Sequence, residues 1–226
     1  MKGRIFRAVV GALILVMAFA PLTAQAAEGK YLAMTFDDGP SGRFTRRLLE
    51  ELEGRQSRVT FFLCGYRLEQ YPDMAGRMLH GYSHACMENM SPEKLEWELS
   101  KTESLLREQT GTTSYLLRPP GGQTNQAVIH AAESHGLSLI TWSVDPKDWA
   151  TSNREKVVRS VVDHARDGDV ILLHDMSDSS VDAALEIIDR LEAAGYQFVT
   201  VSELARLRGK TMEAGCLYTN FRPAFE

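Results

Sequence analysis

Strand-like and helix-like segments alternate along almost the whole chain, and this alternation restricts the fold more than any other feature of the sequence. Residues 31–37 alternate as a strand does, with large apolar side chains at 32, 34 and 36 on one side, whereas residues 43–52 repeat apolar side chains at helical spacing. Further strands are expected at 59–64, 115–117, 137–144, 170–173 and 198–201, and further helices at 68–79, from 91 onward, and near 125–135, 154–166 and 181–194. Serial strand–helix repetition produces a parallel sheet, and right-handed crossovers curl it. The sequence therefore predicts one α/β domain that approaches a (β/α) barrel.

Polar side chains directly follow several of these strands. Asp37 and Asp38 end the first strand, and Arg118, Asp145 and His174 each follow a later one. In parallel α/β barrels the carboxyl ends of the strands form the active face. These residues come from distant parts of the chain, so we expect them to meet in one assembled site.

The N-terminus has the features of an export signal. Three basic residues precede an apolar stretch over 8–20, and residues 24–26 read Ala-Gln-Ala, the small-x-small pattern that signal peptidase recognises. The alternative is an uncleaved membrane anchor, but the stretch is short beside the roughly 20 apolar residues of a spanning helix. We predict a signal peptide over 1–26, a single domain over 27–226, and a secreted or cell-wall-associated protein.

Charge restricts the partners of this domain. The formal net charge of −5 falls by three to −8 when residues 1–26 are removed, because that segment holds three basic residues and no acidic ones. Nucleic acids and anionic lipid headgroups select basic surfaces, so neither is expected as a partner. Membrane contact is expected only through an uncleaved N-terminal segment. A neutral or weakly charged glycan is compatible with this charge.

The chain contains three cysteines, an odd number for an exported protein. Cys64 lies in an apolar strand-like run, where a buried free thiol is the simpler interpretation. A disulfide between Cys64 and Cys86 stays open, because pairing cannot be deduced from the sequence. Cys216 completes the set, and the absence of a Cys-x-x-Cys spacing argues against a thiolate metal site.

Two short motifs carry groups that can bind a metal. Asp37 and Asp38 precede a Gly-Pro turn, and adjacent carboxylates cannot both point the same way. One can therefore bind a cation while its neighbour accepts a proton. His80 and His84 are four residues apart, and two imidazoles with one carboxylate leave a position open for water. Taken alone, the first motif is most often an ordinary turn and the second is most often incidental.

Three further motifs supply charge and proton transfer. Arg118 begins a proline-restrained loop, where it can pair with a carboxylate and keep that group ionised. Asp145 can orient a histidine, and Trp149 can form the wall of a pocket. If Asp145 holds one ring nitrogen of His174, the other nitrogen can donate a proton to a leaving group. Each motif alone has an ordinary structural explanation, as a rigid turn, a core tryptophan or a boundary histidine.

These separate explanations do not account for the occurrence of all five motifs in one chain and in this order. The chain reads TFDDGP at 35–40, HGYSH at 80–84, RPPGG at 118–122, WSVDPKDW at 142–149 and ILLHD at 171–175. This set resembles the NodB-like polysaccharide deacetylases, carbohydrate esterase family 4, with all five family motifs in family order. The resemblance extends from about residue 30 to residue 208 and implies an α/β fold, a deformed (β/α) barrel of the polysaccharide deacetylase type.

The resemblance also implies a mononuclear divalent metal. Carried over by position, the ligands are Asp38, His80 and His84. Zinc is the metal commonly found in the family, and cobalt, manganese or nickel are alternatives. A metal bound in this way activates water for hydrolysis.

The remaining roles follow from the same comparison of motifs. Asp37 would be the catalytic base, tuned by Arg118, and His174 would be the general acid, with its charge set by Asp145. The residues expected to line the substrate pocket are Pro119, Trp149 and Leu172.

One departure from the family pattern concerns the segment before His80. The family normally places a short strand there, with a sequence like Gly-His-Glu-(Ile/Val)-Gly, but residues 77–79 run directly from a predicted helix into His80. We therefore expect a barrel that lacks one short strand and a metal site that is weakened by the loss. Residues 87–90 also replace a shorter loop and are expected to alter one rim of the groove.

The function implied by the resemblance is that of a secreted, metal-dependent hydrolase. It would remove N-acetyl groups from amino-sugar polysaccharide and release acetate, with the N-acetylglucosamine of peptidoglycan as the leading substrate. Chitin oligomers and acetylated xylan stay open as substrates, because the pocket motifs are shared. A different interpretation is a catalytically impaired glycan-binding relative, disabled by the missing strand.

Overall fold

The computed structural model describes residues 29–74 and 78–224 of the protein. The predicted signal peptide over 1–26 lies outside the described residues. Within the described ranges, no helix is both long enough and apolar enough to cross a membrane.

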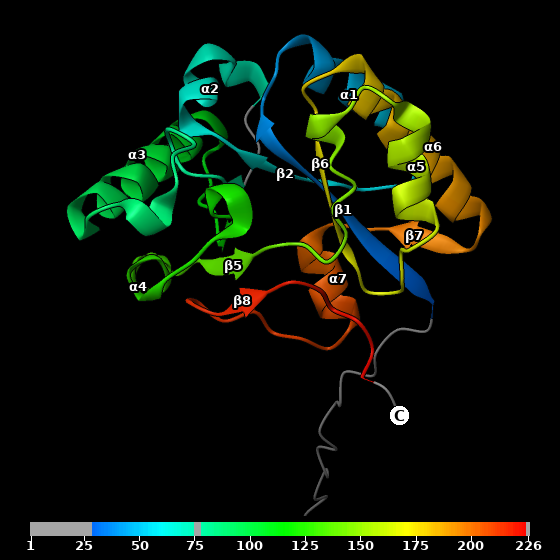
Figure 1. The fold of residues 1–226 in the computed structure, drawn as a ribbon. Coiled ribbons are helices and arrows are strands. Elements are labelled where there is room, and N and C mark those ends of the chain that lie inside the picture. Colours follow the sequence, from blue (N-terminus) through cyan, green and yellow to red (C-terminus); the bar gives the residue numbers. More distant parts are fainter. Residues whose placement is uncertain (1–28, 75–77, 225–226) are drawn as a thin grey trace, which may run out of the picture.

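The centre of the molecule is a parallel sheet (Figure 1). Its strands are β1 (Lys30–Gly39), β2 (Thr60–Leu63), β3 (Met78–Leu79), β4 (Leu116–Leu117), β5 (Ser138–Ile140), β6 (Val170–His174), β7 (Tyr196–Phe198) and β8 (Leu217–Tyr218). They follow the order β6-β1-β2-β3-β4-β5-β8, and β7 pairs with β1. Between β5 and β6, Val144 forms an isolated parallel bridge to Ile171. The sheet thus curls into an open, incompletely closed barrel, which confirms the predicted α/β class.

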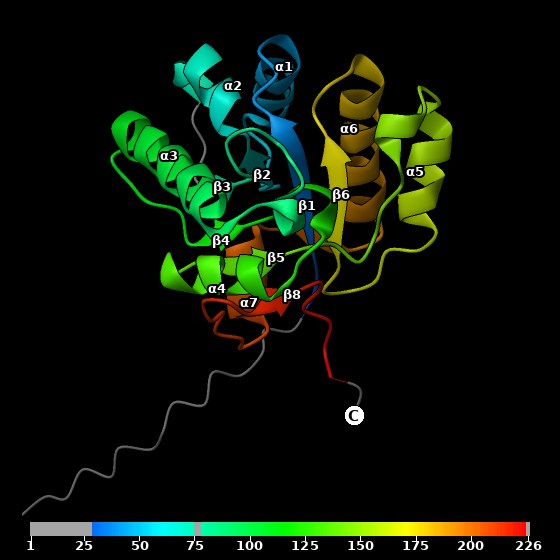
Figure 2. The ribbon, with the colours of Figure 1, turned by 60° about the vertical axis from the view of Figure 1, so that its left-hand side comes forward.

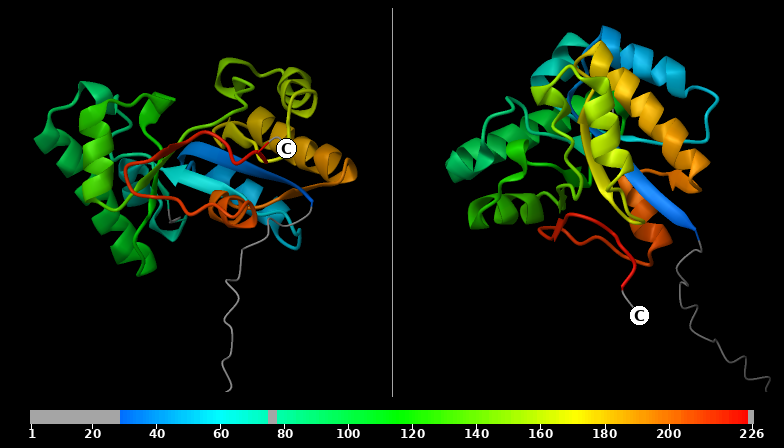
Figure 3. Two further views of the ribbon diagram at one scale, coloured as in Figure 1. Left: turned by 90° about the horizontal axis from the view of Figure 1, so that it is seen from below. Right: turned by 45° about the vertical axis from the view of Figure 1, so that its right-hand side comes forward.

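Helices surround the sheet (Figures 1 and 2). They are α1 (Arg43–Leu52), α2 (Gly65–Gln70), α3 (Pro92–Thr110), α4 (Gln126–Ser134), α5 (Arg154–Val162), α6 (Asp178–Ala193) and α7 (Val201–Leu207). Short 3-10 turns are η1 (Pro72–Met74), η2 (Met87–Asn89), η3 (Pro120–Gly122) and η4 (Asp148–Ala150). Helices α5 and α6 lie side by side along the flank of β1 and β6 (Figure 3), and α7 lies at the end of the sheet opposite to the strands' carboxyl ends (Figure 2).

Strand β1 is buried on both of its faces, which fixes the position of the residues at its end. Leu32 and Phe36 belong to the core beneath the outer helices, where they pack in one cluster with Ile187 of α6. Ala33 points to the other side and belongs to the barrel interior, together with Phe62 of β2. Burial of a strand on both faces is typical of parallel sheets and leaves no freedom in register.

The segment before His80 corrects the prediction of a missing strand. Helix α2 ends at Gln70 rather than near residue 79, and Pro72 follows, a residue that does not continue a helix. Met78–Leu79 then form β3, which pairs in parallel with β2 and with β4. Leu79 is fully buried between these strands, so tertiary packing overrides the helical pattern of the sequence. The strand is short but present, and it delivers His80 to the site.

Candidate active site and metal centre

The predicted residues meet at the carboxyl ends of the strands. Asp37 and Asp38 belong to the end of β1, His80 follows β3, Arg118 follows β4 and His174 ends β6. A cavity of about 450 Å³ opens between them. Its lining consists of Asp37, Asp38, His80, His84, Gly121, Trp142, Asp145, Trp149, Leu172 and His174.

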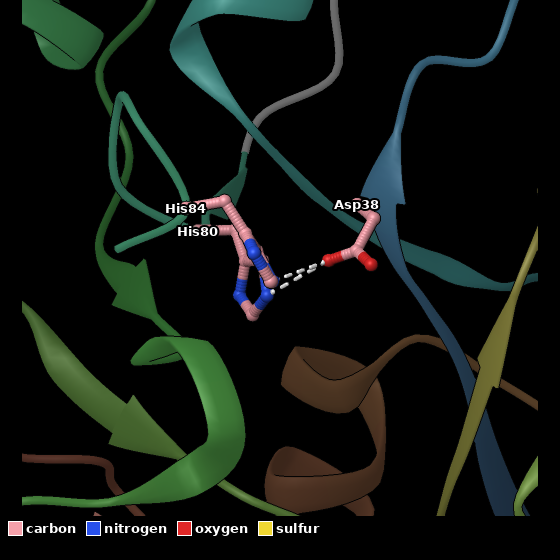
Figure 4. Close-up of side chains that lie close together, drawn as sticks. All are labelled: Asp38, His80 and His84. Atoms are coloured by element: carbon pink, nitrogen blue, oxygen red, sulfur yellow. Dashed lines mark ion pairs between the residues drawn. The ribbon is translucent and has the colours of Figure 1, made fainter. Parts of the chain in front are cut away.

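Asp38, His80 and His84 converge on one point (Figure 4). The Oδ1 atom of Asp38 lies 2.8 Å from Nε2 of His84 and 3.3 Å from Nε2 of His80. One oxygen and two nitrogens at this separation can share a zinc ion, which bonds such atoms at about 2.0–2.2 Å. The arrangement leaves further coordination positions open toward the cavity.

The hydrogen bond of His80 shows that this donor set fits a cation. Its Nδ1 lies 2.7 Å from the carbonyl oxygen of Arg118, which can only accept, so Nδ1 carries the hydrogen. The neutral ring then directs the lone pair of Nε2 toward the carboxylate of Asp38. Two acceptors that face each other require a positive group between them, either a proton or a metal ion. A backbone carbonyl on the far nitrogen is also the usual way to orient a histidine ligand.

The pKa shifts of the triad also favour an ionised Asp38 beside a positive group. Burial by itself raises the pKa of Asp38, but hydrogen bonds from His80 and His84 outweigh it and hold the pKa below its ordinary value. The hydrogen bond to Asp38 raises the pKa of His84 in turn. The site therefore stabilises a carboxylate beside positive charge.

Two of the three candidate ligands have unusual backbone conformations. Asp38 has φ 69° and His84 has φ 59°, both in the left-handed region that non-glycine residues seldom adopt. Each such residue costs on the order of 1–3 kcal/mol and persists only where the surrounding structure holds it. Backbone strain at both positions is typical of a functional site.

Arg118 lies against Asp37 inside the barrel, with no exposed surface. Its Nη1 donates to Oδ1 of Asp37 at 2.6 Å and to Oγ1 of Thr35 at 2.7 Å. Its other nitrogens donate to the carbonyl oxygens of Ile140 and Thr141. Four hydrogen bonds therefore fix the guanidinium, and its positive charge lies against the carboxylate of Asp37 at the floor of the cavity.

The partner of His174 is Asp148, which corrects the prediction of Asp145. Nδ1 of His174 lies 2.9 Å from Oδ1 of Asp148, and the His174 backbone N–H donates to Oδ2 of the same carboxylate at 2.8 Å. Asp145 instead accepts a hydrogen bond from the backbone N–H of Lys147. Lys147 has φ 55°, and this left-handed turn carries Asp148, rather than Asp145, beneath the imidazole.

The remaining nitrogen of His174 faces the cavity, 4.0 Å from Oδ2 of Asp38. Burial alone would lower the pKa of His174, but the hydrogen bond that its Nδ1 donates to Asp148 outweighs burial and raises the pKa above its ordinary value. A histidine held in this way can carry a proton at neutral pH.

The predicted pocket residues are placed unevenly. Leu172 is buried and lines the cavity, and Trp149 stands at its rim with 65% of its surface exposed. Pro119 is buried and is not among the residues that line the cavity, whereas Gly121 of the same loop is; a substrate contact of Pro119 stays a prediction. Trp142 also lines it and was missed, although it is the first residue of the fourth motif.

The cysteines take no part in the site as thiolate ligands. All three are free, so Cys64 and Cys86 are not paired. Cys64 is fully buried, and this burial raises the pKa of its thiol. The buried free thiol expected from the sequence is therefore confirmed.

A second hollow extends the cavity along the surface. It has a volume of about 550 Å³ and shares Asp38, Trp149 and His174 with the first. Its outer wall contains hydroxyl side chains that precede and begin α6, among them Ser177 and Ser179. The two hollows meet at the exposed face of Trp149, so the site is open to an extended molecule.

This combination of fold and site defines a class of carbohydrate-active protein. Residues 24–140 match the sequence profile of the family described as Polysaccharide deacetylase. The protein belongs to the polysaccharide deacetylase family.

Curated relatives carry the same domain. The chain is 36% identical over 192 residues to a peptidoglycan-N-acetylglucosamine deacetylase of Bacillus cereus, with 79% of this chain and 90% of that protein covered. It is 35% identical over 187 residues to the peptidoglycan-N-acetylmuramic acid deacetylase PdaC of Bacillus subtilis, with 79% of this chain covered. The match spans only 39% of PdaC, so this chain corresponds to less than half of that longer protein.

A solved structure shares the architecture. The family 4 acetyl xylan esterase from Clostridium thermocellum, in complex with a cobalt ion, superposes with a TM-score of 0.77 and 29% sequence identity. The superposition covers 84% of this chain and 98% of the esterase.

Proposed function

We propose that this protein is a secreted, metal-dependent hydrolase that removes N-acetyl groups from the N-acetylglucosamine of peptidoglycan and releases acetate. One observation carries the proposal. The Asp38, His80 and His84 triad lies in one cavity with a neutralised carboxylate, Asp37, and a histidine held by a carboxylate, His174. Hydrolysis of an amide needs these elements: a site for a cation, a base and an acid.

The triad would hold a divalent cation, which when bound polarises the acetyl carbonyl and lowers the pKa of a water molecule. Two imidazoles and one carboxylate suit zinc, and cobalt, nickel and manganese are alternatives. The complex of the related acetyl xylan esterase with cobalt supports a metal at this position.

Asp37 would act as the base. Its Oδ1 is taken by Arg118, while Oδ2 lies on the side of His80, 3.7 Å from Nε2. The charge of Arg118 lies against Oδ1, and Oδ2 would accept a proton from the water that attacks the carbonyl carbon. The water oxygen forms a bond to the carbonyl carbon, and this oxygen leaves in the acetate product after the carbon–nitrogen bond breaks.

His174 would act as the acid. Its Nε2 faces the cavity, and Nδ1 donates to Asp148, so the carboxylate stabilises the positively charged ring. As the carbon–nitrogen bond breaks, Nε2 donates its proton to the departing amine. The sugar leaves as a neutral amine, and the acetate stays in the cavity beside Leu172 until it is released.

A glycan substrate is supported by the shape of the site and by the relatives. The hollow on the far side of Trp149 leaves room for neighbouring sugars, and an exposed indole beside hydroxyl groups is suited to a sugar ring. The two curated relatives named above act on peptidoglycan by name, which favours this polymer over chitin oligomers or acetylated xylan. Export through the predicted signal peptide would place the protein beside it.

The glycan-binding alternative loses its main support. It depended on a missing strand before His80, and β3 occupies that position with His80 held between Leu63 and Arg118. We therefore propose a catalytic protein rather than an impaired relative.

The test is acetate release by chelator-stripped protein, with and without added zinc, from peptidoglycan, N-acetylglucosamine oligomers and acetylated xylan. We expect zinc-dependent release from peptidoglycan and none from an Asp37→Asn control that still binds zinc. Acetate release from acetylated xylan alone would mean that xylan, and not peptidoglycan, is the substrate. A folded, zinc-loaded protein that releases no acetate from any of the three would refute the hydrolase.

A further inference from the structure

Glu98 of α3 has no exposed surface and directs its carboxylate at the loop between the two candidate histidine ligands. Oε2 accepts hydrogen bonds from the backbone N–H groups of Tyr82 at 2.7 Å and Ser83 at 2.8 Å. Oε1 accepts from Oγ of Ser83 at 2.5 Å, and Nζ of Lys94 lies 3.3 Å from the same oxygen. One side chain thus satisfies three donors of a loop that contains no regular structure.

The opposite edge of this loop is held by α2. The backbone N–H of Gly65 donates to the carbonyl oxygen of Gly81, and that of Tyr66 donates to the carbonyl oxygen of Tyr82. The loop is therefore hydrogen-bonded from two sides, with its carbonyls directed at α2 and its N–H groups at Glu98. Removing either support therefore loosens the backbone that leads into His84.

His84 depends on this support more than His80 does. The ring of His80 is buried, with its Nδ1 fixed by the carbonyl of Arg118. The side chain of His84 is 42% exposed and its backbone is in the left-handed region. Packing does little to place an exposed ring, so the backbone that immediately precedes His84 must place it.

We propose that Glu98 is a positioning residue for the metal centre, acting through the Tyr82–Ser83 backbone to hold His84 in the geometry of a ligand. This inference rests on the proposed metal site but names a residue outside it. A carboxylate suits the role because it offers several lone pairs to converging donors. Partners that orient ligands in this way typically contribute 10–100-fold to metal affinity.

The experiment measures the zinc dissociation constant of chelator-stripped full-length protein by competition with a chromophoric chelator. Glu98→Gln keeps the shape and one acceptor oxygen, and we expect it to weaken zinc binding about 10-fold, with Glu98→Ala nearer 100-fold. Glu96→Gln, on the same helix and directed at His135 instead, is the matched control and should bind zinc as the unchanged protein does.

A double-variant cycle separates positioning from general loosening. In a His84→Ala background the ligand that Glu98 holds is gone, so adding Glu98→Gln should change the zinc dissociation constant by less than twofold. Circular dichroism of the metal-free proteins checks that every variant in the comparison is folded. Equal zinc binding by the unchanged protein and Glu98→Gln would overturn the inference, and so would equal losses in both backgrounds. An unchanged protein that binds no zinc would instead overturn the metal site itself.

Discussion

Nη1 of Arg118 lies 2.6 Å from Oδ1 of Asp37, and both side chains are almost completely removed from solvent. In such a setting each charge depends on the other, because taking either one out of water alone is strongly unfavourable. Thr35, Ile140 and Thr141 accept further hydrogen bonds from the guanidinium and fix it against Asp37. This ion pair therefore contributes both to the stability of the barrel interior and to the chemistry of the site at the carboxyl ends of the strands.

The first prediction concerns this pair. Arg118→Met leaves Asp37 as a buried carboxylate without a counter-charge, and we expect the free energy of unfolding to fall by about 3–5 kcal/mol. Urea denaturation of the metal-free protein at pH 7 measures it. In an Asp37→Asn background the same substitution should cost clearly less. An equal loss in both backgrounds would assign the effect to packing and not to charge.

The second prediction distinguishes the two aspartates of the fourth motif. Asp148→Asn removes the carboxylate that holds His174, so kcat should fall substantially, within the roughly 10²–10⁴-fold that general acid catalysis contributes. Asp145→Asn should reduce kcat much less, because Asp145 bonds only within its own turn. Steady-state kinetics on N-acetylglucosamine oligomers, with zinc affinity measured in parallel, makes the comparison. A larger loss in Asp145→Asn than in Asp148→Asn would contradict the assignment.

The sequence predicted the face of the fold on which the site lies, and the physical reason is the geometry of parallel strands. Asp37, Arg118 and His174 directly follow apolar runs, and the carboxyl ends of parallel strands meet at one edge. The class of fold followed from the same alternation. These inferences need only the local hydrophobic pattern and the rule that crossovers between parallel strands are right-handed.

Features that depend on tertiary packing could not be predicted from the sequence. The motif at 145–148 offers two aspartates, and only the left-handed turn at Lys147 decides which one meets His174. Met78–Leu79 read as the end of a helix because their pairing partners are distant in the chain. Glu98 looks like any acidic residue of a charged helix, and its burial depends on a loop that lies 15 and 16 residues earlier in the sequence.

The third prediction concerns Asp175, a carboxyl group with no exposed surface. Oδ2 accepts from Oγ1 of Thr45, and Oδ1 has no hydrogen-bond partner within the described residues. Burial raises the pKa of Asp175 from 3.8 to about 6. Because the folded pKa lies above the unfolded value, its stabilising contribution is complete below pH 3.8 and is lost as the pH rises through about 6.

Asp175→Asn replaces the titrating group by a neutral amide and should remove this pH dependence. Relative to the variant, the unchanged protein should lose on the order of 3 kcal/mol of unfolding free energy between pH 4 and pH 7.5. Urea denaturation of the metal-free proteins at several pH values measures the difference. A difference that stays constant over this interval would show that Asp175 ionises normally in the folded protein.

The last prediction concerns His135, which joins α4 to α3. Its Nε2 lies 2.8 Å from Oε2 of Glu96 and its Nδ1 lies 2.8 Å from Oε2 of Glu103. Two carboxylates can both accept from the ring only when both nitrogens carry hydrogen, that is, in the charged form. Burial alone would lower the pKa of His135, but the two carboxylates outweigh it and raise the pKa above 6.5.

A raised folded pKa means that this ion pair stabilises the protein below pH 6.5 and loses its effect as the pH rises through the folded value. His135→Asn should therefore lower the urea midpoint more at pH 6 than at pH 9, with a pH-dependent part of about 1 kcal/mol because Glu96 is exposed. His164→Asn is the matched control, since the His164 ring, just after α5, bonds the carbonyl oxygen of Ser160 and, within the described residues, no carboxylate. If the two variants show the same change between pH 6 and pH 9, His135 holds the helices together by packing and not by charge.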